Sequence, residues 1–357
     1  MGICVGMPGT ARRAAVATLV AGGIIVLALA LWKLRLVLAL IFFALIVAAA
    51  MRPGIEWLKR HGVPRGAGLA LHYVTLLAVI AVGLTLAVPR ALDQVNRALS
   101  PSGKAQIARQ AKNSTGIKHE VLAALQKRLK HLPTKSKLVK PAEQIGVTAF
   151  EVVIGIFFTF AAAAYWIFER DKAINLVCSL LPRPRRKLVR DTWDLIDAKL
   201  GAFVRGQVLL IGLVGTALSL LFWAIGEPYW ILVGAFAGLV EVIPVIGPLA
   251  AGALAITVGL TASLHVALLA AGCVFAVRLC EDYLVMPRIL GDAVGLSPML
   301  VLVSVTMMGI LFSGWAVLFA VPLAAVLVTL FDVILRDVDP AEEEVPAVIF
   351  STRESEA

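Results

Sequence analysis

The sequence predicts an all-α polytopic membrane protein with about eight transmembrane helices and with broken or re-entrant segments in its C-terminal half. Of the 357 residues, 60% are hydrophobic and 16% are charged, whereas a soluble domain is roughly half apolar and a quarter charged. The apolar residues form long runs rather than the short alternating segments of a β-barrel. Proline, glycine and charged residues interrupt the later runs, which predicts helices that break within the membrane.

The N-terminal membrane region, residues 1–89, is predicted to contain three spans. Its first apolar run follows Arg12 and Arg13, as in a signal peptide, but the run is longer than a usual signal core and a second run follows almost at once. We therefore expect an uncleaved first span. The basic loop MRPGIEWLKRHGVPRG is expected in the cytoplasm by the positive-inside rule. The three predicted spans cover residues 14–32, 36–51 and 67–88.

Residues 90–145 form a polar and basic insertion. Within it, KHEVLAALQKRLKHL places leucines at 3-4-3 spacing, which gives an amphipathic helix one narrow apolar seam. Such a seam can pack against the same segment of a second subunit, against the protein's own spans or on the membrane surface. We expect the chain to form a homo-oligomer. The alternation of spans puts the insertion outside the cytoplasm, since long loops cross regardless of their charge. The leucines of the seam are Leu122, Leu125, Leu129 and Leu132.

The C-terminal membrane transport region, residues 146–335, begins with spans at 147–168 and 208–225. The loop between them, residues 169–205, is strongly basic and is expected in the cytoplasm. Part of this loop has the pattern of an amphipathic helix, whose charged residues we expect on a solvated face. Those residues are Asp191, Asp194, Asp197, Lys199 and Arg205.

The stretch LVEVIPVIGPLAA breaks a long apolar tract, residues 229–277. Proline and glycine interrupt helical backbone, and at membrane depth such backbone survives only inside the protein or along a wet cavity. A carboxylate at this depth usually faces the bundle interior. We expect the substrate or ion path here, at Glu241, Pro244, Gly247 and Pro248. The tract is long enough for two spans, or for one span and a re-entrant piece.

A second charged cluster interrupts residues 278–299, RLCEDYLVMPRILGDAVGLSPM. Arg278 and Asp282 are four residues apart, so they can pair on one helix face. One interpretation is a membrane-edge turn with a local ion pair. The other is a turn that folds back against Glu241 and helps form the path.

The last apolar region, residues 300–335, is broken near Pro322 and is too long for one span of about 20 residues. It is expected to form a hairpin, or a re-entrant half-helix and a span. The acidic tail, residues 336–357, has the composition of a disordered end. Hydropathy allows eight to ten crossings, and eight put both termini in the cytoplasm.

Three stretches resemble the autoinducer-2 exporter (AI-2E) family of bacterial membrane transporters. They are the loop MRPGIEWLKRHGVPRG, the motif EVIPVIGPLAA, and EDYLVMPRILGDAVGLSPMLVLVSV followed by GWAVLFAVPLAA. Their order and spacing match from about residue 15 to 335. The resemblance implies about eight spans, a polar insertion after the third, and transport of a small molecule or ion without ATP in a bacterial inner membrane.

The resemblance also implies which residues form the path. Two positions depart from the family pattern, because Ser297 stands where the family often has His and Leu254 where it often has a second Pro. The implied residues are Glu241, Pro244, Gly247, Pro248, Glu281, Asp282, Pro287, Arg288, Gly291, Gly295, Pro298 and Pro322, to which the pairing argument adds Arg278.

These features favour a secondary transporter that exports a small polar solute, such as an autoinducer-2-type signal. A Na⁺(Li⁺)/H⁺ antiporter and a non-transporting structural membrane protein are the alternatives. No hydrolase, zinc-protease or P-loop motif occurs, so we expect no enzyme, no cofactor and no metal site. The formal net charge is +10, but the sequence contains no recognised nucleic-acid-binding motif, so we expect no nucleic-acid partner. The expected partners are therefore the lipid bilayer, a small polar solute with Na⁺ or H⁺, and further copies of the chain.

Overall fold

The computed structural model describes residues 8–100, 109, 120, 139–244, 246–289, 295–312, 314–343, 345 and 348. Every element it describes is a helix. Seven of the described helical segments are long and apolar enough to cross a membrane. They belong to α1 (Pro8–Lys33), α2 (Arg35–Arg60), α3 (Arg65–Leu99), α6 (Val139–Ser179), α7 (Arg183–Ala224), α10 (Leu264–Cys280) with the π-helical turn Glu281–Val285, and the 3₁₀ turn Gly314–Phe319 with α13 (Ala320–Leu335). The chain is therefore an all-α polytopic membrane protein.

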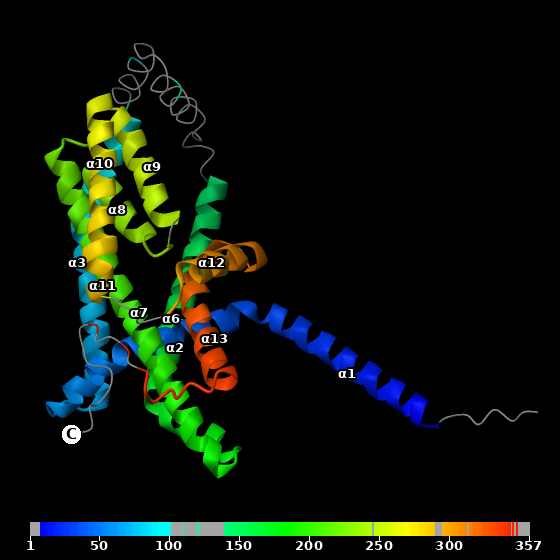
Figure 1. The fold of residues 1–357 in the computed structure, drawn as a ribbon. Helices are drawn as coiled ribbons and strands as arrows, with labels where there is room; N and C mark the ends of the chain where they lie inside the picture. Colours follow the sequence, from blue (N-terminus) through cyan, green and yellow to red (C-terminus); the bar gives the residue numbers. More distant parts are fainter. Residues whose placement is uncertain are drawn as a thin grey trace, which may run out of the picture.

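Three shorter apolar helices account for the broken tracts: α8 (Trp230–Val240), α9 (Ile246–Leu260) and α12 (Pro298–Phe312). With 11 and 15 residues, α8 and α9 are about 16 Å and 22 Å long, less than the roughly 30 Å of a bilayer core. The two helices pack against each other as a hairpin, and α10 lies beside them (Figure 1). Residues 229–277 thus contain a hairpin of two short helices followed by α10, which with the π-helical turn is long enough to cross a membrane.

Small residues bring α7 and α8 unusually close together. A Cβ atom added to Gly234 would lie 2.2 Å from the Ser219 Oγ, and one added to Gly238 would lie 2.6 Å from the Ile211 carbonyl oxygen. The spacing Gly-x-x-x-Gly therefore presents a flat backbone face to α7. Around this contact, the buried side chains of α7–α10 form one apolar core, which fixes the position of the hairpin. Its members are Val214, Leu218, Phe222, Val233, Ala237, Ala251, Ala255 and Ala270.

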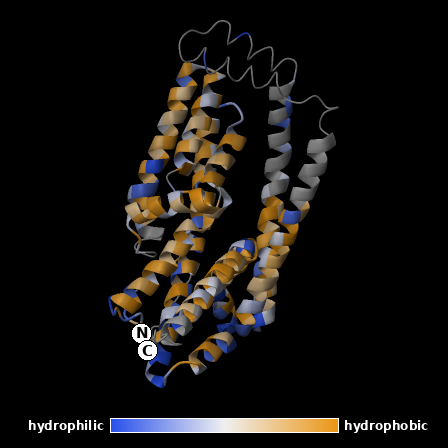
Figure 2. Ribbon diagram, turned by 90° about the vertical axis from the view of Figure 1, so that its right-hand side faces the viewer, coloured by the Kyte–Doolittle hydropathy of each residue, from blue (hydrophilic) through white to orange (hydrophobic). Residues whose placement is uncertain are grey.

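Apolar side chains also cover the outside of the bundle. Figure 2 shows hydrophobic residues along most of the helical surface and hydrophilic residues at the end that holds the α2–α3 and α6–α7 loops. Helix α1 projects away from the other helices (Figure 1), and its apolar window has no buried residue. A soluble protein rarely exposes an apolar surface of this extent, so the outer faces are suited to lipid.

The described part of the acidic tail packs against the bundle. Lys199 of α7 is buried, and its Nζ lies 2.5 Å from the Glu343 Oε1 and 3.1 Å from the Thr329 Oγ1 of α13. The Arg205 Nε donates to the Val348 carbonyl oxygen at 2.9 Å, and Val348 is 3% exposed. Two buried cations of α7 therefore hold the tail against the bundle, which composition alone cannot reveal.

Candidate functional site

The break between α8 and α9 places a carboxyl group at the tip of the hairpin. Glu241 directly follows the last residue of α8 and is 7% exposed. Pro244 lies in the turn, where the Ile246 and Gly247 amides donate to the carbonyls of Pro244 and Ile243 at 2.7 and 2.8 Å. Pro248 lies in the first turn of α9, where a missing amide donor costs least.

Gly247 allows the two halves of the hairpin to meet. A Cβ atom added to it would lie 2.2 Å from the Val240 carbonyl oxygen and 3.1 Å from the Cα of Glu241. Any larger residue would push α9 away from the end of α8. The glycine of the EVIPVIGP motif is therefore needed for close backbone approach at the tip.

The second charged cluster folds back onto this tip. The Arg278 Nη1 lies 3.1 Å from the Glu241 Oε1 and 3.1 Å from the Glu281 Oε2, and its Nη2 lies 2.9 Å from the Asp282 Oδ1. The predicted i,i+4 pair is thus present, and the fold-back arrangement, rather than an isolated turn at the membrane edge, is the one observed. We call Glu241, Arg278, Glu281 and Asp282 the acidic cluster.

The acidic cluster has more negative than positive groups. One guanidinium faces three carboxyl groups, and Glu281, like Glu241, is buried, with 5% of its surface exposed. The Glu241 Oε1 and the Glu281 Oε2 both lie 3.1 Å from the same Arg278 Nη1, so the two carboxyl groups lie close together. Two carboxylates this close to each other repel, and a proton or a cation bound by one of them relieves the repulsion. The arrangement can therefore hold one proton or one small cation beside Arg278.

A cavity of about 560 Å³ opens beside the acidic cluster. The Gln207 Nε2 reaches it from α7 and donates to the Glu241 carbonyl oxygen at 3.1 Å. Phe203, Leu210 and Val321 supply apolar wall, and the Ser297 Oγ accepts a hydrogen bond from the Leu300 amide at 3.3 Å. Polar groups gathered at one end of an apolar cavity are typical of small-molecule sites.

Some of the predicted path residues line this cavity and others lie near it in the chain. Glu241, Pro244, Arg278, Glu281 and Gly295 are lining residues, and Gly295 has a positive φ of 60°. Gly291 lies outside the described residues. Four further predicted residues do not line the cavity. Pro287 and Arg288 belong to α11 (Met286–Ile289), and Pro298 begins α12. Pro322 is buried in α13, next to the lining residue Val321.

Gln207 and Phe203 were not predicted as site residues. Both belong to the part of α7 that the sequence assigns to a cytoplasmic helix and the start of a span. The sequence does contain one signal for Gln207, because its polar amide stands at the start of a long apolar run. Polar groups within the membrane usually face the bundle interior. The predicted leucine seam, from Leu122 to Leu132, lies outside the described residues. Among the described residues, no group of three or more His, Cys, Asp or Glu side chains is arranged to hold a metal ion.

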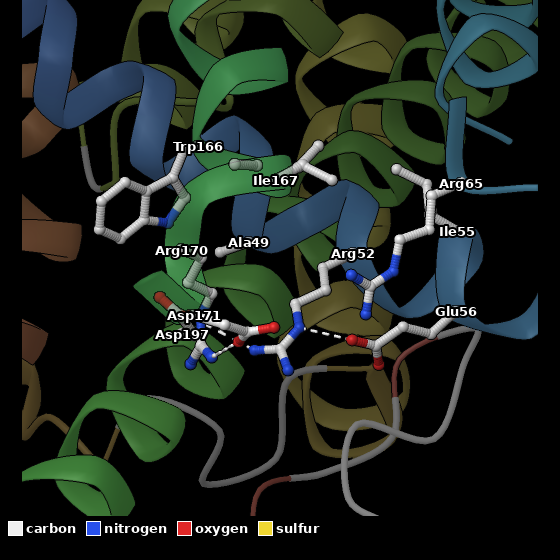
Figure 3. A pocket seen from close by; sticks show the side chains of 11 residues that line it. Ala49, Arg52, Ile55, Glu56, Arg65, Trp166, Ile167, Arg170, Asp171 and Asp197 are labelled. Carbon is white, nitrogen blue, oxygen red and sulfur yellow. Dashed lines mark hydrogen bonds and ion pairs between the residues drawn. The ribbon is translucent and has the colours of Figure 1, made fainter. Parts of the chain in front are cut away.

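A separate ion network joins α2, α6 and α7 at the end that holds the basic loops. The Arg170 Nε lies 2.5 Å from the Asp197 Oδ2, and its guanidinium also contacts Asp194. Arg52 pairs with Glu56 at 2.6 Å and lies 3.6 Å from Asp197 (Figure 3). The pocket drawn there has a volume of only about 30 Å³, so it is too small for a solute.

This network corrects the prediction of a solvated helix face over part of residues 169–205. Asp197, Lys199 and Arg205 are all buried. Their side of α7 packs closely against α2, where a Cβ atom added to Gly201 would lie 2.5 Å from the Ala49 carbonyl oxygen. Sequence reasoning treated these charges as solvated because their partners come from distant parts of the chain. Asp197 and Lys199 form structural ion pairs, and Arg205 donates to the carbonyl oxygens of Ala50 and Val348.

The sequence profile of the AI-2E family transporter matches residues 22–336. A "Putative transport protein YrrI" of Bacillus subtilis (strain 168) is 25% identical over 317 residues, which cover 82% of this chain and 86% of the relative. A "Putative transport protein" of Mycobacterium tuberculosis (strain CDC 1551 / Oshkosh) is 25% identical over 313 residues, which cover 82% of each chain.

These matches span nearly all of the described membrane region, including the hairpin and the acidic cluster. The relatives carry the names of transport proteins, which agrees with seven potential spans and with a cavity beside the acidic cluster. The chain is a multi-pass membrane transporter and belongs to the AI-2E transporter family.

Proposed function

We propose that the chain is a secondary transporter that exports a small polar solute, such as an autoinducer-2-type signal, without ATP. The observation that carries this proposal is the buried acidic cluster on the wall of the cavity of about 560 Å³. A broken helix beside a cavity is the usual site of substrate and coupling ions in secondary transporters.

Glu241 is proposed to carry the proton or the coupling ion. Its side chain touches both Arg278 and Glu281, so a change in its charge alters the partners of the guanidinium. When Glu241 is neutral, Arg278 is free to pair more strongly with Glu281 and Asp282. Proton binding at Glu241 is thereby linked to the contact between the hairpin tip and α10, which is the kind of two-state contact that alternating access requires.

The cavity wall is suited to a small polar solute. Gln207, Ser297 and Arg278 provide hydrogen-bonding groups, while Phe203 and Leu210 provide apolar surface. The polar groups would fix the orientation of the solute, and the apolar wall would exclude water from its other side.

A Na⁺(Li⁺)/H⁺ antiporter is the second candidate. A bound sodium ion needs several oxygen ligands, and the paired Glu241 and Glu281 carboxyl groups supply a first set. Backbone carbonyls at broken helices add ligands in other sodium-coupled transporters. This candidate uses the same acidic cluster but needs no organic solute.

We place the transporter in a bacterial inner membrane, with the lipid bilayer around it and both termini in the cytoplasm. The support is that the α2–α3 loop, the α6–α7 loop and the described part of the tail lie at one end (Figure 1), and the two loops are basic. We also propose a homo-oligomer, since α1 offers an apolar surface with no buried residue in its window. No role in catalysis, cofactor binding or nucleic-acid binding is proposed.

The test is proton flux in proteoliposomes, with wild type, Glu241→Gln and the control Glu169→Gln, and with sodium and autoinducer-2 added separately. Glu169 is exposed, lies 3.4 Å from Lys172 and is not among the residues that line the cavity beside the acidic cluster. We expect Glu241→Gln to abolish coupled flux, because the amide cannot exchange a proton, while Glu169→Gln keeps wild-type flux.

Each outcome decides between the candidates. Flux that needs the organic solute supports the exporter, and flux with sodium alone supports the antiporter. Equal coupled flux in wild type and Glu241→Gln rules out Glu241 as the coupling group. If wild type carries neither ion nor radiolabelled solute and Glu241→Gln changes only stability, the structural alternative is correct.

A further inference from the structure

Glu227 is a buried carboxyl group far from the acidic cluster. It lies in the short turn between α7 and α8 and is 2% exposed. Both of its carboxyl oxygens are inaccessible and have no hydrogen-bond partner among the described residues. Buried carboxyl groups are rarely left in this state, because an ionised carboxylate without partners is very costly in an apolar environment.

The backbone of the turn directs this side chain inward. Gly226 has a φ of 72° and Tyr229 a φ of 58°, so two of the residues around Glu227 adopt the left-handed conformation. That conformation is unfavourable for tyrosine and persists only where the surroundings enforce it. The Glu227 amide donates to the Phe222 carbonyl oxygen at 2.9 Å, which closes the turn onto the end of α7.

The carboxyl group meets the α9–α10 turn at a glycine. A Cβ atom added to Gly259 would lie 3.0 Å from the Glu227 Oε2 and 2.7 Å from the Cα of Ala267. The absence of a side chain at Gly259 thus leaves room for the carboxyl group between α9 and α10. Phe222, fully buried in the core of α7–α10, lies at the base of the same turn.

No described cation faces Glu227. Cys273 of α10 is close enough to interact electrostatically with the carboxyl group. His265 at the start of α10 and Asp93 of α3 are exposed, and Tyr229 of the turn itself is partly exposed. Helix α9 and the second half of α7, from residue 208 onward, contain no ionisable residue. The described surroundings therefore favour an uncharged carboxyl group.

We propose that Glu227 is a proton-binding site that holds the α7–α8 turn against the α9–α10 turn. With its proton bound, the neutral carboxyl group stays in the gap beside Gly259. When the proton leaves, the carboxylate moves out to water and the two turns separate. Helix α8, about 16 Å long, keeps this site apart from Glu241, so it is a second protonation site and not part of the cavity.

The pH range of this transition follows from the burial of the side chain. Burial raises the pKa of Glu227 from 4.5 to about 7. The folded protein then binds one more proton than the unfolded chain between these two values, so the contribution of Glu227 to stability is present at low pH and is lost as the pH rises towards 7 and above. For this one group, the folding equilibrium constant falls by up to about 300-fold between pH 4 and pH 8.

The experiment measures thermal unfolding in lipid nanodiscs from pH 4.5 to pH 8.5 for wild type, Glu227→Gln and Glu169→Gln. Glutamine resembles the protonated acid in shape and charge. We expect Glu227→Gln to equal wild type at pH 4.5 and to be clearly more stable at pH 8.5, while Glu169→Gln follows wild type throughout. The protonated-carboxyl infrared absorption at pH 5.5 should lose the contribution of Glu227 in Glu227→Gln alone, while the contribution of the acidic cluster remains in all three proteins.

Three results would overturn the proposal. The first is the same pH dependence in wild type and Glu227→Gln. The second is a Glu227→Gln protein that is already less stable than wild type at pH 4.5, since a neutral side chain at this position would then not be enough to hold the two turns together. The third is recovery of the wild type at pH 8.5 on addition of sodium or potassium, because the site would then bind a cation rather than a proton.

Discussion

Glu241 and Glu227 are buried carboxyl groups at the two ends of α8, and their surroundings are opposite in character. Glu241 touches Arg278 and Glu281 and lines a cavity of about 560 Å³. Glu227 touches no described cation or donor and faces a glycine. A buried group with charged partners can change its protonation while it stays in place, whereas one without partners must move when it ionises. We therefore assign coupling to Glu241 and a pH-dependent closure of the turns to Glu227.

The strongest way to test this difference is to remove the cation from the Glu241 end. Arg278→Gln leaves the Glu241 and Glu281 carboxyl groups buried without their counter-ion. Breaking a buried pair in this way lowers the free energy of unfolding by roughly 3–5 kcal/mol. We expect a loss of about 2–4 kcal/mol for Arg278→Gln, because a third of the Arg278 side chain is exposed. Coupled flux in proteoliposomes should be lost as well.

The matched control for this prediction is Arg336→Gln. The Arg336 Nη1 lies 3.0 Å from the Asp332 Oδ1, but its side chain is 68% exposed. Loss of such a surface pair changes stability by less than about 1 kcal/mol. Equal unfolding temperatures for the two variants would mean that Arg278 does not neutralise a buried charge, and the contrast between the two ends of α8 would disappear.

A smaller effect is expected from closing the space at the hairpin tip. Gly247→Ala places a Cβ atom 2.2 Å from the Val240 carbonyl oxygen, so the end of α8 and the start of α9 must separate. We expect a loss of about 2–3 kcal/mol in unfolding free energy and a lower rate of coupled flux. Gly252→Ala is the control, since its Cβ atom would meet only the Val274 Cγ1 at 3.7 Å. If Gly247→Ala is as stable as Gly252→Ala, the tip is not fixed by this contact.

Local signals in the sequence mark the helix break and the charged residues at the Glu241 end. Pro244, Gly247 and Pro248 interrupt an apolar tract around a carboxylate, and Arg278 and Asp282 stand four residues apart. Whether the second cluster folds back onto Glu241 depends on how α10 packs against the hairpin. That packing is set by small residues such as Ala255 and Ala270, which carry little information in a chain rich in alanine.

The sequence does not reveal the burial of Glu227 or of the charges in α7. Glu227 precedes a proline in an evident turn, and turns are usually exposed. Its burial depends on Gly259, 32 positions further along the chain. In the same way, Lys199 and Arg205 have the spacing of an amphipathic helix, but their partners Glu343 and Val348 come from the tail. Long-range partners of this kind leave no local pattern.

The smallest expected effect concerns the only described side-chain donor to the backbone at the Glu241 end. The Gln207 Nε2 donates to the Glu241 carbonyl oxygen at 3.1 Å, and both residues are buried. Gln207→Leu removes this hydrogen bond from the buried Glu241 carbonyl oxygen. The free energy of unfolding, measured by thermal unfolding, should fall by about 1 kcal/mol. Because Gln207 also lines the cavity, solute flux should fall more than proton binding at Glu241.

Thr257→Val is the control for this last change, since the Thr257 Oγ1 donates to the Ala253 carbonyl within its own exposed helical turn. Its loss should leave stability within about 0.5 kcal/mol of wild type. If Gln207→Leu also has no effect, the backbone at the tip does not depend on α7. The position of Glu241 would then rest on Arg278 and Glu281 alone, and the two ends of α8 would differ only in their charged partners.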